Sequence, residues 1–334
     1  MRLLHGIVSL IAAASVVAAA QDVHVKVDPK GGGSIASTNN FPTIQNALDH
    51  APQAPNGRIY VEIVPGVYNE RINVTRLRPR LTLVGLGKGP EDVVINASQN
   101  AKSAGGTYFS ETAQVNGDEF EADNITFQNS AGPTGQAVAI VVRSDKAVFK
   151  HCRFLGDQDT LFADFGRQYY VDSFIQGGTD FIFGNATAVF ERDVISEIRN
   201  AQITAQSRTA EWQTTGYVIN HSKITHDPVP SPPGREPATG FGLGRPWREF
   251  ARVVVMHTEE PADLNAAGWS KWGRDDPTQA FYAEFDNSGS GWQPKQRPSW
   301  AHILTAKEAE QFVAKNFLAG ADHWDAAAEA AKLP

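Results

Sequence analysis

The sequence predicts an all-β protein, a parallel β-helix with a short helix near the N-terminus and a helical segment near the C-terminus. One observation is a long series of short apolar runs rich in β-branched and aromatic residues, such as RIYVEIV and ARVVVMH, separated by Gly, Asn, Asp and Pro. A second is that several runs begin with a small or polar residue, at intervals of 28, 21, 20 and 29 positions. These residues are Asn124, Cys152, Ser173, Asp193 and Ser222. A loose period in the twenties without intervening helices predicts coils that bury their apolar faces by stacking.

A β-sandwich or a β-propeller is the alternative to this fold. Both are built from hairpins, whose usual signal is an Asn-Gly or Asp-Gly pair between two adjacent strands. Such pairs are sparse in this chain. The β-helix is therefore the favoured interpretation, and it makes residues 21–334 a single domain.

Helical periodicity is confined to the two ends of the chain. One helical face near the N-terminus would hold Phe41, Ile44, Ala47 and Leu48. The stretch TAKEAEQFVAKNFL predicts a helix over 305–318 that covers exposed coils or the end of the β-helix. Its buried face would hold Ala309, Phe312, Val313 and Phe317. The last residues, DHWDAAAEAAKLP, are either helical or frayed, and 227–242, with five prolines, predicts a long surface loop.

The first 20 residues have the composition of a secretory signal peptide. Arg2 precedes an apolar stretch that ends in Ala18, Ala19 and Ala20, so we expect cleavage after Ala20 and a secreted, extracellular protein. The apolar stretch is too short for a membrane anchor, and no other window is long enough to span a bilayer. In a secreted protein, five Asn-X-Ser/Thr sequences are candidate glycosylation sites. They begin at Asn73, Asn96, Asn124, Asn185 and Asn220.

Charge and cysteine content exclude several classes of partner and cofactor. The formal net charge is −7, and no run of Lys and Arg stands out, so neither nucleic acid nor an anionic membrane is an expected partner. Cys152 is the only cysteine, which excludes an intrachain disulfide, and we expect it to be a small buried hydrophobic residue. The nine histidines are scattered and lack the spacing of zinc ligands. We therefore expect no metal and no cofactor.

Two aspartates occupy equivalent positions on consecutive predicted coils. Asp159 in GDQDTLF and Asp180 in DFIFGNA each lie seven residues after a member of the series of small residues. Neighbouring strands are about 4.8 Å apart, so the two carboxylates should lie side by side, and the pKa of one must rise unless a cation intervenes. Such a pair suits acid/base chemistry. The alternative is that both aspartates cap turns, as we expect of Asp157 and Asp164.

Five motifs appear in an order and spacing that resemble the pectin methylesterase family, specifically its fungal or bacterial type. They are GVYNE (66–70), GQAVAI (135–140), GDQDTLF (156–162), DFIFGNA (180–186) and LGRPW (243–247). The resemblance covers nearly all of the chain after the predicted signal peptide. Only about twenty residues separate the expected cleavage site from FPTIQ, so we expect no inhibitory pro-region of the kind found in plant relatives.

The resemblance implies a right-handed parallel β-helix and the hydrolysis of methyl esters on polygalacturonate, with release of methanol. Carried over by motif, Asp180 would be the nucleophile and Asp159 the general acid and then the general base. Arg245 would pair with Asp180 and keep it ionised. Gln136 and Gln158 would donate amide hydrogen bonds to the oxyanion, although stacking inside the coil is the alternative for each.

Aromatic residues near these motifs are candidates for substrate binding, and the expected partner is methylated homogalacturonan bound by a monomer. Trp247 and Trp269 can present flat faces to sugar rings, and Phe183 can line a pocket for the ester methyl group. Phe162 stands where many relatives carry Tyr, which removes one hydroxyl from the expected site. Core packing is the alternative for the two tryptophans and for Phe183.

Other functions remain open on the same scaffold. Paired carboxylates also serve glycoside hydrolysis, and a polygalacturonase-like enzyme would use Asp159 and Asp180 to cleave the chain itself. A calcium-dependent lyase would need a cluster of acidic residues that the sequence does not show. A polysaccharide-binding protein without catalysis would use the aromatic residues alone, and would gain nothing from two crowded carboxylates.

Overall fold

The computed structural model describes residues 20–31, 39–229, 240–273 and 277–334. The predicted signal peptide therefore lies outside the described residues except for its last position, and so does most of the proline-rich loop predicted at 227–242. Within the described part of the chain, no helix is both long and apolar enough to cross a membrane.

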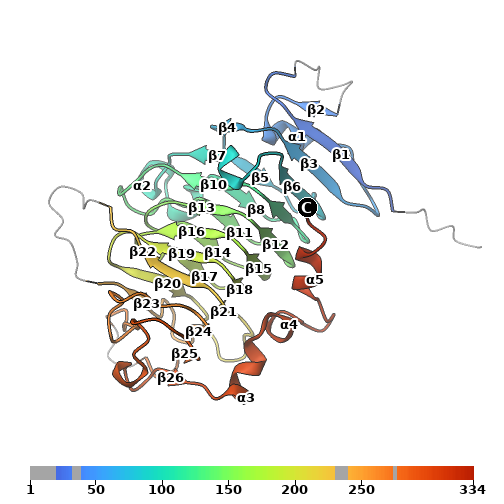
Figure 1. Cartoon of the computed structure of the whole chain (residues 1–334). Helices are drawn as coiled ribbons and strands as arrows, with labels where there is room; N and C mark the ends of the chain where they lie inside the picture. Colours follow the sequence, from blue (N-terminus) through green and yellow to red (C-terminus); the bar gives the residue numbers. More distant parts are fainter. Residues whose placement is uncertain (1–19, 32–38, 230–239, 274–276) are drawn as a thin grey trace, which may run out of the picture.

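Three long parallel sheets run the length of the molecule (Figure 1). We call the twelve-stranded one sheet A. Its strands, in spatial order, are β2 (Asn40–Phe41), β1 (Val23–Val27), β3 (Ile59–Ile63), β6 (Leu81–Gly85), β9 (Glu121–Asp123), β12 (Ala147–Lys150), β15 (Arg167–Val171), β18 (Thr187–Glu191), β21 (Gly216–Asn220), β24 (Arg252–Met256), β25 (Phe281–Phe285) and β26 (His302–Ile303).

The other two sheets have seven strands each. Sheet B consists of β22 (Lys223–His226), β19 (Val194–Glu197), β16 (Phe174–Gly177), β13 (Arg153–Leu155), β10 (Thr126–Asn129), β7 (Val93–Ala97) and β4 (Gly66–Tyr68). Sheet C consists of β23 (Gly242–Gly244), β20 (Gln202–Gln206), β17 (Ile182–Gly184), β14 (Leu161–Ala163), β11 (Ile140–Val142), β8 (Ala113–Val115) and β5 (Ile72–Val74). The chain visits A, B and C in turn, as in β12, β13 and β14. The predicted right-handed parallel β-helix is confirmed.

The periodic small residues of the sequence form a buried ladder at the turn between sheets A and B. The backbone N–H of Cys152 donates to the Ser173 hydroxyl at 3.0 Å, that of Ser173 to the Asp193 carboxyl at 2.8 Å, and that of Asp193 to the Ser222 hydroxyl at 3.0 Å. Asn124 was wrongly placed in this series. The register of β10 and β13 puts its neighbour, not Asn124 itself, beside Cys152.

Aromatic rings fill the interior of the central coils. Phe149, Tyr170 and Phe190 stack with centroid separations of 4.9 and 4.7 Å, and all three are fully buried. Because each ring lies above an equivalent position one coil away, the coil-to-coil register is fixed by packing as well as by the sheets.

The predicted N-terminal helix is confirmed as α1 (Ile44–His50), which buries Ile44, Ala47 and Leu48. Phe41, which was expected on the same helical face, lies before the helix in strand β2 and is buried there. Thr43 caps its first turn, and the carboxylate of Glu70, from the GVYNE motif, accepts the backbone N–H groups of Ile44 and Gln45 at 3.0 Å each. A carboxylate at this position satisfies free donors and complements the helix dipole. The other short helical segments before the C-terminal region are η1 (Pro90–Asp92), α2 (Ala101–Ala104), η2 (Thr107–Phe109) and η3 (Pro294–Gln296).

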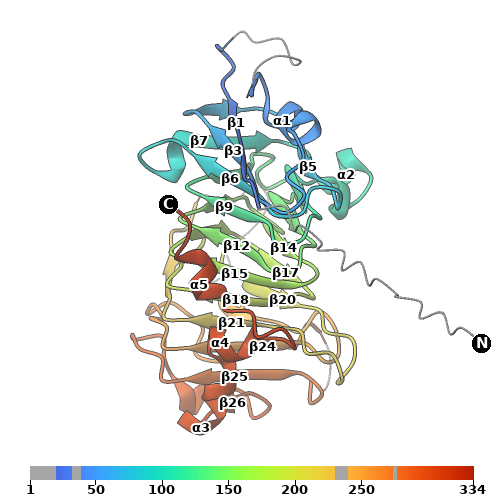
Figure 2. The same cartoon turned by 90° about the vertical axis from the view of Figure 1, so that its right-hand side faces the viewer.

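The C-terminal segment is not the single helix expected over 305–318. It is broken into α3 (Ala306–Ala309), η4 (Glu310–Phe312) and α4 (Ala314–Phe317), followed by α5 (Ala326–Ala330). Val313 has extended backbone angles and is exposed, so the predicted helical face does not exist there. α4 and α5 lie along the outer face of sheet A, and α3 lies beside its last strand, β26 (Figure 2). The extended backbone of Val313 separates η4 from α4 and allows Phe312 and Ala314, on either side of it, both to be buried.

Candidate active site

A cavity of about 450 Å³ opens on the outer face of sheet C. Its lining includes every site residue expected from the sequence except Trp269. The lining residues are Thr107, Tyr108, Gln136, Gln158, Asp159, Phe162, Asp180, Phe183, Ala205, Arg245, Trp247 and Trp272.

Asp159 and Asp180 lie at matching positions just before β14 and β17. The parallel register pairs Phe162 with Phe183, which places the two aspartates beside each other on adjacent coils. Both have left-handed backbone angles, with φ of 65° and 49°, which Asp tolerates better than most residues. The predicted adjacency of the two carboxylates is confirmed, while their catalytic roles stay predictions. The turn-capping alternative does not describe this arrangement, because both side chains line the cavity.

Arg245 reaches Asp180 from two strands away. It follows β23, and its backbone N–H donates to Thr204 of the intervening strand β20 at 2.9 Å. Its guanidinium donates two hydrogen bonds to the Asp180 carboxylate, at 2.8 and 2.6 Å. Gly244 allows this close approach, since a Cβ there would lie 1.9 Å from the Thr204 hydroxyl. The small side chain of Ala205 leaves the space between β17 and β23 open for the guanidinium.

The two carboxyl groups have different electrostatic surroundings. Burial, and then the charge of Asp180, raises the pKa of Asp159 to about 8, against opposing effects of Gln158 and Arg245. Burial also raises the pKa of Asp180 above its ordinary value, but the hydrogen bonds and charge of Arg245 act in the opposite direction. At neutral pH the pair can therefore hold one proton on Asp159 beside an ionised Asp180.

Gln136 and Gln158 both line the cavity beside this pair. Their backbones are on adjacent coils, and the N–H of Ala137 donates to the Gln158 carbonyl at 3.0 Å. Each side chain is only partly buried, so neither is packed away inside the coil. The placement allows amide donation to a bound carbonyl, and the oxyanion role stays a prediction.

An aromatic wall forms one side of the cavity. Phe162 stacks on Phe183 with centroids 4.3 Å apart, and Trp247 lies 6.1 Å beyond Phe183. Tyr108 meets the other side of Phe162, edge to face, at 6.4 Å. Tyr108 was missed from the sequence because it sits in the short helical turn η2, where no motif or periodicity marks it.

Trp269 is not part of the cavity, and its predicted role in substrate binding is wrong. It is 4% exposed, packs edge to face on Tyr282, and donates its indole N–H to Glu284 at 2.8 Å. Trp272, three residues later, lines the cavity instead, with the Arg245 guanidinium 4.0 Å from its ring centroid. Both tryptophans belong to AGWSKW, and only the fold separates the buried one from the lining one.

These observations define the class of protein: a parallel β-helix protein whose candidate catalytic groups are two adjacent aspartates and an arginine, set in an aromatic-walled cavity. The sequence profile of the pectinesterase family matches residues 34–321. The chain belongs to the pectinesterase family.

Relatives and solved structures agree with this assignment. The chain is 38% identical over 306 residues to Pectinesterase 1 of Citrus sinensis, a match covering 88% of this chain and 51% of that protein. It is 35% identical over 306 residues to Pectinesterase 31 of Arabidopsis thaliana, covering 88% and 92%. The structure of pectin methylesterase from carrot superposes with a TM-score of 0.81 at 33% identity, covering 93% of this chain and 96% of that one.

The chain spans about half the length of several of the curated relatives it matches, including the Citrus protein. The relatives from Citrus sinensis and Arabidopsis thaliana and the carrot structure are all plant proteins. The narrower expectation of a fungal or bacterial type is therefore not supported, and the assignment stands at the level of the family.

Proposed function

We propose that this protein is a pectin methylesterase, which hydrolyses the methyl esters of polygalacturonate and releases methanol. One observation carries the proposal. Two adjacent carboxyl groups share a cavity, and only Asp180 has a two-pronged arginine contact, while burial raises the pKa of Asp159 to about 8. Ester hydrolysis through a carboxylate nucleophile needs this combination of an ionised group and a proton donor.

In the first step, the ionised Asp180 attacks the ester carbonyl carbon. The carbonyl oxygen becomes an oxyanion, which the amide groups of Gln136 and Gln158 stabilise, each donor being worth about 10²- to 10³-fold in rate. The bond to the methoxy group then breaks, and Asp159 gives its proton to the departing methanol. The products of this step are free methanol, an ionised Asp159 and an anhydride between Asp180 and the substrate acyl group.

In the second step, the ionised Asp159 takes a proton from a water molecule that attacks the anhydride. The acyl bond to Asp180 breaks, which releases the uronate carboxyl product and regenerates the Asp180 carboxylate. Asp159 is again protonated, so both groups return to their starting states. Arg245 holds Asp180 in one orientation throughout, because its planar guanidinium binds both carboxylate oxygens.

The wall of Phe162, Phe183, Trp247 and Tyr108 fits a methylated sugar polymer. Flat apolar faces contact sugar rings, and the stacked pair of Phe162 and Phe183 offers an apolar surface to the ester methyl group. Phe162 contributes no hydroxyl, so substrate contact at that position is apolar. We expect methylated homogalacturonan to be the partner and a monomer to be the active form.

The decisive experiment is an assay of purified protein on highly methylated pectin, with chelator present. Methanol is measured beside new reducing ends. Methanol without new reducing ends supports the esterase. New reducing ends without methanol would assign the same two carboxylates to glycosidic cleavage, and polymer binding with neither product would leave only a binding protein.

We propose, in addition, that the protein is secreted after loss of residues 1–20 and glycosylated at Asn73. Asn73 is exposed, whereas Asn220 is 2% exposed and donates a side-chain hydrogen bond to Glu191. A glycan is bulky and needs a position on the surface of the folded protein, so a glycan on Asn220 is disfavoured. N-terminal sequencing and glycopeptide mass spectrometry of protein from a culture medium test both points, and an intact Met1 on medium protein would contradict the cleavage.

A further inference from the structure

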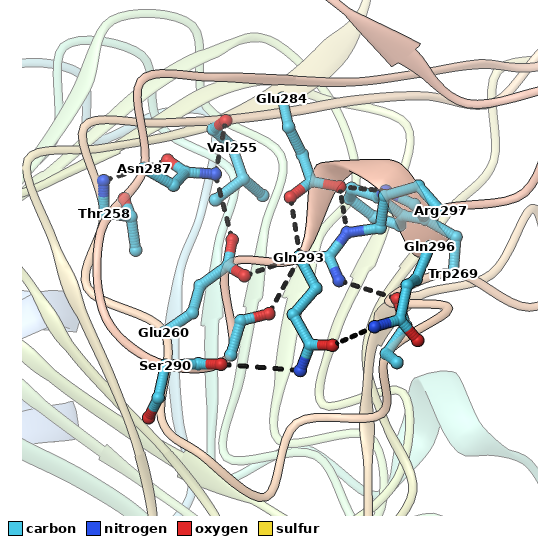
Figure 3. Close-up of polar contacts among 12 residues, drawn as sticks. Val255, Thr258, Glu260, Trp269, Glu284, Asn287, Ser290, Gln293, Gln296 and Arg297 are labelled. Atoms are coloured by element: carbon cyan, nitrogen blue, oxygen red, sulfur yellow. Dashed lines mark hydrogen bonds and ion pairs between the residues drawn. The ribbon is translucent and has the colours of Figure 1, made fainter.

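A buried charged network lies inside the C-terminal coils of the β-helix, and Figure 3 shows its polar contacts. The side chains of Arg297, Glu260 and Glu284 are at most 1% exposed. The guanidinium donates to both oxygens of Glu284, at 2.7 and 2.9 Å, and to Glu260 at 2.6 Å. Farther along the axis, stacked aromatic rings fill the same interior. Burying ions is seldom more stabilising than apolar packing. Stability alone therefore does not explain why a charged network, and not aromatic rings, fills the interior at this end.

The network holds one particular loop segment in place. Arg297 donates to the backbone carbonyl of Ala266 at 2.9 Å, and Glu284 accepts the indole N–H of Trp269 at 2.8 Å. Gly268 lies between these two contacts with φ of 66°, and a Cβ added to it would lie 2.8 Å from Nε of Arg297. The guanidinium therefore packs directly against the backbone of this segment.

The same segment is hydrogen-bonded to β23, the strand that directly precedes Arg245. The backbone N–H of Leu243 donates to the Gly268 carbonyl at 2.7 Å, and that of Ser270 donates to the Gly244 carbonyl at 3.1 Å. Arg245 is the next residue. Its backbone is thus held between β20 on one side and the segment anchored by the network on the other.

A second contact reaches the Arg245 side chain. Trp272, three residues beyond the anchored Trp269, places its ring 4.0 Å from the Arg245 guanidinium. A cation over an aromatic face is held by both electrostatic and packing forces. The orientation in which Arg245 meets Asp180 therefore depends on where this loop segment lies.

We propose that Arg297 is a positioning residue for the active site, which fixes the loop segment 266–272 and thereby the orientation of Arg245 toward Asp180. Arg297 touches neither of these residues. A guanidinium suits the task because its fixed fork binds the carboxyl groups of Glu260 and Glu284 and a backbone carbonyl at defined angles, whereas lysine would supply only a point charge. The inference rests on the proposed esterase function and deepens it.

The test compares two perturbations of the network with a matched control. Arg297→Lys keeps the charge and loses the fork. Trp269→Phe keeps an aromatic ring but loses the hydrogen bond to Glu284 and part of the buried indole volume. Arg58→Lys is the control, since Arg58 forms an ion pair with Glu121 at 3.1 Å near the opposite end of the β-helix. All three are checked for folding by circular dichroism and thermal unfolding.

For both network variants we expect kcat for methanol release to fall about tenfold, with KM changed less than about twofold, because a small displacement of catalytic groups lowers the rate more than binding. The acidic limb of the kcat/KM profile should move to higher pH, because a displaced Arg245 stabilises the ionised Asp180 less well. Arg58→Lys should leave this limb in place. If Arg297 had only a structural role, the variants would be less stable but the acidic limb would stay at the same pH.

A ¹³C NMR titration of the Asp180 carboxyl group gives a readout that does not need turnover. Its pKa should rise in Arg297→Lys and Trp269→Phe. If either folded variant titrates and turns over like the wild type, or if Arg58→Lys produces the same shift, the positioning role is wrong. If Arg297→Lys does not fold, Trp269→Phe alone decides. A wild type that releases no methanol would refute the proposed function but not this titration test.

Discussion

Replacing Arg245 by lysine tests whether the two-pronged contact keeps Asp180 ionised. Lysine retains the positive charge, but its ammonium group cannot donate to both carboxylate oxygens in the planar geometry of the two bonds at 2.8 and 2.6 Å. The Asp180 side chain is 8% exposed, so water can replace little of the lost contact. We expect the pKa of Asp180 to rise, and the acidic limb of the kcat/KM profile to rise with it.

The magnitude follows from the number of bonds lost. Losing one of two hydrogen bonds to a charged group costs about 1.5–3 kcal/mol. Because the Arg245 side chain is 30% exposed, we take the lower end of that range. About 1.5 kcal/mol corresponds to a pKa rise of about one unit, and therefore to about a tenfold loss of kcat/KM at pH values below the pKa of Asp180.

The assay is methanol release from methylated pectin across pH, with Arg192→Lys as the control. Arg192 makes the same kind of two-pronged contact with Asp172, at 2.8 and 2.9 Å, on a turn outside the cavity lining. Its replacement should leave the acidic limb unchanged. An acidic limb in Arg245→Lys that coincides with that of the wild type would refute the electrostatic role given to Arg245.

Three further outcomes are expected. In Asp180→Asn the rate of methanol release should fall by about 10⁴-fold or more, because the nucleophile is removed. Calorimetry should show that the variant binds pectin like the wild type. A rate within tenfold of the wild type would mean that another residue is the nucleophile. Asp159 must be protonated to release methanol, so kcat/KM should fall above pH about 8, and activity that keeps rising beyond that pH would contradict its role as the acid. Burial, and then the charge of Glu284, raises the pKa of Glu260 to about 8. The unfolded state therefore loses the Glu260 proton at lower pH than the folded state does. The free energy of unfolding should consequently fall as pH rises from about 4.5 to 8. In Glu260→Gln, thermal unfolding across that range should show a shallower decline, and an unchanged slope would mean that Glu260 is ionised in the folded protein throughout.

The paired aspartates were predictable because β-helix coils repeat a local pattern. Small polar residues recur at Ser173, Asp193 and Ser222 because each side chain accepts a hydrogen bond from the backbone N–H of the preceding coil. Cys152 occupies the same row and donates its backbone N–H to Ser173. Asn124 resembles them in sequence but occupies the neighbouring row, where residues adopt positive φ. Asn is common both in turns where a side chain bonds the backbone and at positions with positive φ. The residue type alone therefore could not show that Asn124 lies one position before the row of Cys152.

Other parts of the site depended on contacts between distant segments. Trp269 and Trp272 are equivalent in local sequence, and the choice between them is made by Glu284, which accepts a hydrogen bond from only the first. Tyr108 reaches the cavity from a short turn with no period. The break at Val313 buries Phe312 and Ala314 against sheet A, and helical periodicity does not contain this contact with the assembled coils.

The C-terminal segment also has a consequence for the order of events during synthesis. It covers apolar side chains on the outer face of sheet A, among them Val148, Val189 and Val218, and Lys150 donates to the carbonyl groups of Leu333 and Pro334. Coils that form while the ribosome is still translating must therefore expose this face until the last residues emerge. During that interval the nascent chain exposes apolar surface that can pair with other chains, so aggregation competes with folding until the C-terminal segment docks.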